Sequence, residues 1–149
     1  MGAAAITASA ATTAEAADAG TQVDRVAALF DGVDLGAWSV DEVHPVRHGS
    51  IVAVMRTPGG ERFHVDVLRR DPSGACGIAE TPSFSLFVAN RGDGETITGE
   101  DQGRGAMLLA RFLSDREARL VAAGAPLPEL LTHGERMRAF PDGRFFPRA

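Results

Sequence analysis

Residues 50–119 constrain the fold more than any other part of this 149-residue chain. Two segments with strand composition, 51–56 and 62–68, flank the tetrapeptide Thr57-Pro58-Gly59-Gly60. Proline presets φ at the second position of a turn, and glycine tolerates the positive φ that a type II turn needs at the next. The pattern therefore predicts a β-hairpin.

The turn also predicts a strand register. Pairing Thr57 with Gly60 places Val54 opposite Phe63, so these two side chains share one face of the hairpin. The other face is also largely apolar, whereas a face turned only to water would be more polar. We therefore expect both faces to be covered, by the chain itself or by another copy. The apolar residues expected on the second face, with one from the next strand, are candidates for partner binding: Ile51, Ala53, Met55, Leu68 and Phe87.

One more strand and a long helix follow. Aromatic and aliphatic residues at 84–90 predict a third strand. Thr98 followed by Asp101 resembles a capping box, and it introduces a helix over about 100–121 that Gly124 ends. Leu109 and Leu113 lie on its apolar face, and three further apolar side chains widen that face beyond what one sheet face usually covers: Met107, Leu108 and Phe112. The expected fold is α+β, a small antiparallel sheet packed by one long amphipathic helix with short flanking helices.

The ends of the chain carry weaker signals. Residues 1–20 are rich in Ala and Thr and predict a disordered or fraying arm. They lack the basic start of a secretory signal. Residues 21–149 are expected to form a single domain. It would begin with a short helix over 21–30, be anchored by Trp38 and contain another short helix from Pro128 towards Met137. It would end in an apolar tail that is a further candidate for partner binding, containing Phe145 and Phe146.

Composition excludes several classes of function. The chain has fifteen Arg but no Lys or Tyr, which we read as the coding bias of a GC-rich, bacterial genome. Without lysine there is no Schiff-base or P-loop lysine. A net charge of −5 argues against a general nucleic-acid binder, which needs a basic surface. Cys76 is the only cysteine, which fits a cytoplasmic location, and no apolar run approaches the roughly 20 residues of a membrane span.

The strongest candidate for chemistry is a His/Asp pair. His64 and Asp66 alternate on the predicted second strand, where they could act as a base and its orienting acid. Cys76, Ser83 or Ser85 would then supply a nucleophile. None of these three residues lies in a recognisable local signature, and such a pair is more often an exposed polar edge of a sheet.

Metal and nucleotide sites have less support. His44 and His48 are four residues apart, but Pro45 breaks the helix that would align them, so we expect no metal and no cofactor. The glycine-rich loop 92–105 follows a strand and opens a helix, which is the topology that holds phosphate. Its acidic residues suit a helix N-terminus without any ligand: Asp93, Glu95, Glu100 and Asp101.

In element order alone, helix, three strands and helix, the chain resembles the double-stranded-RNA-binding domain. That resemblance would imply that basic side chains bind the phosphates of RNA, whereas this chain is acidic and has no lysine. We therefore expect neither a nucleic acid nor a membrane as a partner.

The surplus of apolar faces favours a non-enzymatic accessory, adaptor or assembly protein that binds a protein partner, a second copy, or both. The alternative is a small-molecule- or nucleotide-binding enzyme that uses His64 and Asp66, with Cys76 as a possible third residue.

Overall fold

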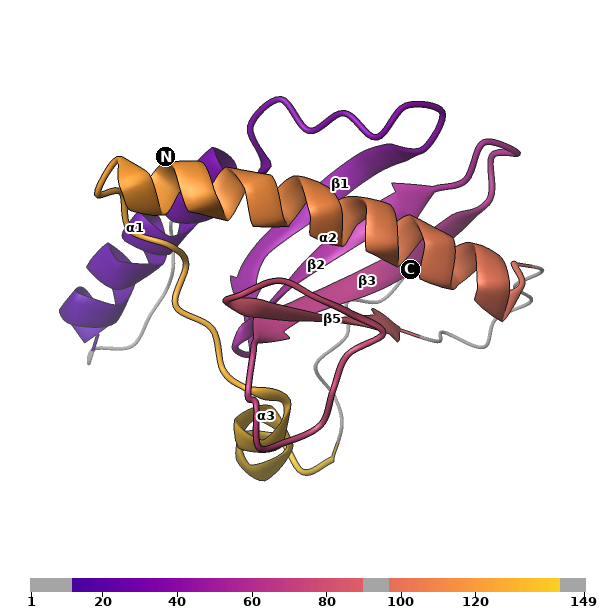
Figure 1. Cartoon of the computed structure of the whole chain (residues 1–149). Helices are drawn as coiled ribbons and strands as arrows, with labels where there is room; N and C mark the ends of the chain where they lie inside the picture. The colour runs from indigo at the N-terminus through magenta and orange to yellow at the C-terminus, as the bar shows by residue number, and fades with distance from the viewer. Residues whose placement is uncertain (1–11, 90–96, 143–149) are drawn as a thin grey trace.

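A five-stranded antiparallel sheet carries the fold (Figure 1). The computed structural model describes residues 12–89 and 97–142. Within them the strand order is β1-β2-β3-β5-β4. The elements are α1 (Thr12–Phe30), β1 (Ser39–Arg47), β2 (Ser50–Arg56), β3 (Arg62–Arg69), β4 (Ala79–Glu80), β5 (Phe84–Ala89), α2 (Gly99–Ala122) and α3 (His133–Ala139). The α+β class is confirmed, as are the hairpin of β2 and β3, the third strand β5 and the long helix α2.

The predicted hairpin register is wrong by one residue. Met55, not Val54, lies opposite Phe63. The Thr57 N–H donates to the Glu61 carbonyl at 2.8 Å, so the loop between these two residues contains three residues. Its last residue, Gly60, has φ +96°. A glycine with positive φ at this position adds one residue to the loop. Since side chains alternate along a strand, that shift exchanges the faces of β2 relative to β3.

The corrected register puts the core beneath α2, which crosses one face of the sheet (Figure 1). Leu109 and Leu113 of α2 are fully buried there, as the helix pattern predicts. The strand residues that form this face are Ile51, Ala53, Met55, Phe63, Val65 and Val67, with Phe84 and Leu86 of β5. The last turns of α1 complete the cluster with Val26, Leu29 and Phe30.

Helix α3 lies against the opposite face. Its approach is fixed by the preceding segment: the Leu131 N–H donates to the Gly49 carbonyl, and the Leu131 carbonyl accepts from the Arg69 N–H, both at 2.8 Å. Thr132 and Glu135 then form a complete capping box. The helix therefore begins at His133, later than the predicted start near Pro128. Elements of the same chain thus pack against both faces of the sheet.

The N-terminal elements are a helix longer than the one predicted over 21–30 and an edge strand, β1, for which the sequence gives no prediction. Helix α1 begins at Thr12, so residues 12–20 of the predicted arm are helical, while residues 1–11 lie outside the described part. Strand β1 contains Pro45 and two register shifts. Proline is tolerated there because β1 is an edge strand. Just before β1, Trp38 packs edge-on against Phe63, with ring centroids 6.3 Å apart, which confirms its predicted anchoring role.

Two glycines in the first turns of α2 should respond oppositely to substitution. A Cβ at Gly105 would lie 2.7 Å from Phe63 Cζ and 2.8 Å from Trp38 Cζ3, so the two rings need this position to be bare. A Cβ at Gly103 would meet only Ile78, at 3.4 Å. We expect Gly105→Ala to lower the free energy of unfolding by about 1–3 kcal/mol through overpacking. Gly103→Ala should raise it by up to about 1 kcal/mol through helix propensity. Urea unfolding of both variants checks this, and equal effects would contradict the close packing at Gly105.

Candidate functional site

A buried ion pair joins β3 to α3. Arg136 Nη1 lies 3.0 Å from Asp66 Oδ2, and the two side chains are 2% and 1% exposed. The same Nη1 donates to the Ser50 hydroxyl at 3.1 Å. Strands β2 and β3 and helix α3 thus meet at one guanidinium group.

Burial dominates the electrostatics of this pair. Desolvation raises the pKa of Asp66 to about 6, although the Arg136 charge and hydrogen bond oppose that shift. Among the described residues, no hydrogen bond reaches Asp66 Oδ1, which is also buried. Because the folded-state pKa lies above the ordinary value of 3.8, ionisation of Asp66 disfavours folding as the pH rises from about 4 to about 6. At neutral pH the carboxylate is charged and depends on Arg136.

The predicted catalytic residues are placed in different surroundings. His64 is half-buried on the same face as Asp66, two residues away along β3. Cys76 is exposed in the loop before β4. Ser83 is half-buried, whereas Ser85 is buried with its hydroxyl donating to Glu80 at 3.0 Å. The structure therefore gives Asp66 a different charged partner, Arg136, which sequence reasoning missed.

The described ranges of the chain contain no assembled metal site. Within residues 12–89 and 97–142, no group of three or more His, Cys, Asp or Glu side chains is placed to hold a metal ion. His48 packs edge-on against Phe140, with ring centroids 4.7 Å apart, and its pKa is lowered, chiefly by burial. On β1, His44 Nε2 lies 3.4 Å from Glu42 Oε1.

The predicted partner-binding face does not exist as one surface. Three of its residues are fully buried in the core beneath α2: Ile51, Ala53 and Met55. Leu68 is fully buried on the other face of the sheet. Phe87, also on that face, is half-buried and stacks on His133, with ring centroids 5.0 Å apart. The register error explains the difference, since it assigned residues of β2 to the wrong face. Phe145 and Phe146 lie outside the described residues.

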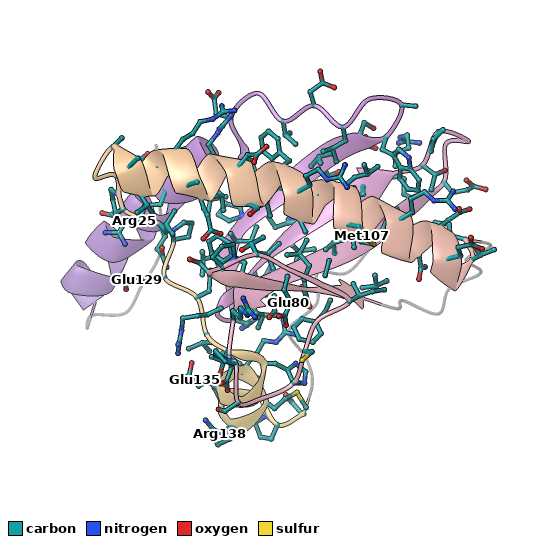
Figure 2. All side chains as sticks on the ribbon, viewed as in Figure 1. Arg25, Glu80, Met107, Glu129, Glu135 and Arg138 are labelled. Atoms are coloured by element: carbon teal, nitrogen blue, oxygen red, sulfur yellow. The ribbon has the colours of Figure 1, made fainter. Side chains whose placement is uncertain are left out.

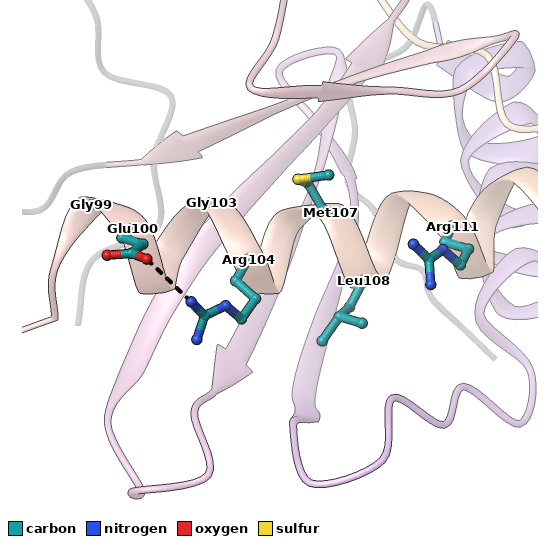
Figure 3. A pocket seen from close by; sticks show the side chains of 7 residues that line it. All are labelled: Gly99, Glu100, Gly103, Arg104, Met107, Leu108 and Arg111. Atoms are coloured by element: carbon teal, nitrogen blue, oxygen red, sulfur yellow. Dashed lines mark hydrogen bonds and ion pairs between the residues drawn. The ribbon is translucent and has the colours of Figure 1, made fainter.

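An exposed apolar surface occurs instead on α2. A shallow hollow of about 400 Å³ is lined by Gly99, Glu100, Gly103, Arg104, Met107, Leu108 and Arg111, which we call the α2 outer face (Figure 3). Met107 lies near its centre and is 58% exposed. Ile78, 48% exposed, lies beside Gly103 at the border of this face. The excess width of the helix's apolar stripe was the sequence signal for this surface.

Charged side chains surround Met107 on the α2 outer face. Arg104 forms ion pairs with Glu100 at 3.3 Å, marked in Figure 3, and with Asp101 at 3.6 Å. Arg111 lies one helical turn beyond Met107. Figure 2 labels Met107 on α2 and Glu135 on α3, and so locates this face and the helix that contributes Arg136 to the buried pair.

No helix in the described part of the chain has both the length and the apolar composition needed to cross a membrane. Comparison of the chain with protein-family models, with curated proteins and with solved structures gives no match.

Proposed function

We propose that this protein is a non-enzymatic accessory or assembly protein that binds a protein partner, which can be a second copy of the chain, through the α2 outer face. The observation that carries the proposal is the exposed Met107 in a shallow hollow between charged residues. Protein interfaces commonly combine an apolar centre, enriched in methionine, with a polar rim. The flexible side chain of methionine also adapts to irregular partner surfaces.

The edges of the sheet favour a partner that docks on a helix rather than by adding a strand. Strand β1 is interrupted by Pro45 and by two register shifts. It also carries Asp41, which pairs with Arg56 at 2.7 Å. At the other edge, β4 has only two residues. Short, irregular and charged edges resist pairing with another chain.

The environment of Asp66 also supports a non-enzymatic role. A catalytic acid that orients His64 would need its charge available to the imidazole, whereas Asp66 is buried against Arg136. We place the protein in the cytoplasm, because the exposed Cys76 thiol suits a reducing compartment.

Met107→Asp tests the proposal, with Val121→Asp as the matched control. The two residues lie on the same helix and are 58% and 60% exposed, but Val121 lies outside the α2 outer face. Burying a carboxylate in an apolar contact should weaken binding at least about tenfold. Affinity capture of the tagged chain from its native host, read by quantitative mass spectrometry, should recover a bound protein with wild type and Val121→Asp but not with Met107→Asp. Equal recovery with all three chains would contradict the proposal.

A further inference from the structure

We propose that the occupant of the α2 outer face is a second copy of this chain, bound through an antiparallel pair of α2 helices. The inference rests on the proposed function and names the partner at the same surface. It is carried by the order of charges along this face and by the exposed Met107 among them.

The spacing of the face reads the same in both directions. Glu100, Arg104, Met107 and Arg111 are separated by four, three and four residues. All four line the hollow. A two-fold axis pairs a surface with itself, residue i against residue j and j against i. In an antiparallel pair, Glu100 therefore lies opposite Arg111 of the second copy, and Arg104 opposite Met107 of the second copy.

The charges of this face are self-complementary in that register. The two-fold axis generates the Glu100–Arg111 contact twice, so each copy supplies one acid and one base. Within one copy Arg104 reaches both Glu100 and Asp101. Asp101 can therefore keep Arg104 paired when Glu100 turns to the second copy. With Asp101 included, the face carries two acidic and two basic side chains and so has no net repulsion against itself.

The exposed Met107 also suits this pairing. Met107 lies along the aliphatic stem of Arg104 of the second copy, a surface that long basic side chains readily offer to apolar groups. Helices packed in this way are about 8–10 Å apart. Residues 100–111 span only about 17 Å, so we expect a reversible dimer rather than a permanent one.

A charge exchange tests the register. Sedimentation equilibrium of the full chain, over concentrations from low to high micromolar, should show a monomer–dimer equilibrium for wild type. Arg111→Glu and Glu100→Arg should each raise the dissociation constant at least about tenfold, because each places like charges in contact. The double variant should return it to within a factor of about three of wild type. Arg119→Glu, an exposed charge reversal on α2 outside the face, should leave it unchanged. Circular dichroism confirms that each variant is folded.

A wild-type chain that stays monomeric throughout the series would overturn the inference. The capture experiment with Met107→Asp would still judge the proposed function, because it detects partners other than this chain. A dimer that tolerates Arg111→Glu, or that the double variant does not restore, would equally overturn the antiparallel register.

Discussion

Replacing Asp66 with alanine should lower the free energy of unfolding by about 3–5 kcal/mol at pH 7.5, the usual cost of removing one partner of a buried ion pair. The Arg136 side chain is 2% exposed and its Nη1 contacts Asp66 and Ser50. Without the carboxylate, a positive charge remains in an environment that cannot solvate it. Urea unfolding followed by circular dichroism measures the change. The pH must exceed about 6, because below it Asp66 is protonated in the folded chain.

A double variant separates the cost of the unpaired charge from the net value of the pair. Asp66→Leu with Arg136→Met removes both charges and keeps apolar volume on both elements. It should be markedly more stable than Asp66→Ala, since replacing a whole buried pair by apolar groups is often neutral. If Asp66→Ala alone lowers the free energy of unfolding by less than about 1 kcal/mol, water reaches Arg136. The ion pair then does not hold α3 against the sheet.

The elements predicted correctly from the sequence are those specified by neighbouring residues. The hairpin follows from a Pro-Gly-Gly turn between two apolar segments. Helix α2 begins at the predicted cap, where Thr98 Oγ1 accepts from the Asp101 N–H at 3.0 Å, and ends just before Gly124, which has φ +72°. The register failed because the same turn residues fit a two-residue or a three-residue loop. The choice depends on the backbone at Gly60, which composition does not specify.

The buried pair lies beyond the reach of local patterns. Asp66 and Arg136 are 70 residues apart in the sequence. They meet because Leu131 is held between the backbones of Gly49 and Arg69, a contact that no periodicity indicates. From the sequence alone, an aspartate two residues from a histidine on a strand therefore indicates only a polar edge or part of a catalytic pair.

The α2 outer face was predictable in part. The apolar stripe of α2 is wider than one sheet face needs, so some of its residues had to face elsewhere. Which residues these are depends on how the helix is rotated against the sheet. Gly105 has no side chain, so the helix can pack closely against Phe63 and Trp38 at this position. This close packing sets the rotation of the helix and leaves Met107 exposed. The sequence alone does not indicate this rotation, because the packing partners of Gly105 lie on other elements.

The same rotation makes Leu113 a core residue, and Leu113→Ala should lower the free energy of unfolding by about 2–5 kcal/mol. Leu113 is fully buried in the cluster beneath α2, so truncation removes apolar contact and leaves a cavity. Val121→Ala is the control, since Val121 is 60% exposed on the same helix and alanine has the higher helix propensity. Its effect should stay within about 0.5 kcal/mol of zero. Urea unfolding of both variants gives the comparison. A loss below about 0.5 kcal/mol for Leu113→Ala would mean that α2 presents a different face to the sheet, and the assignment of Met107 to the outer face would then be wrong as well.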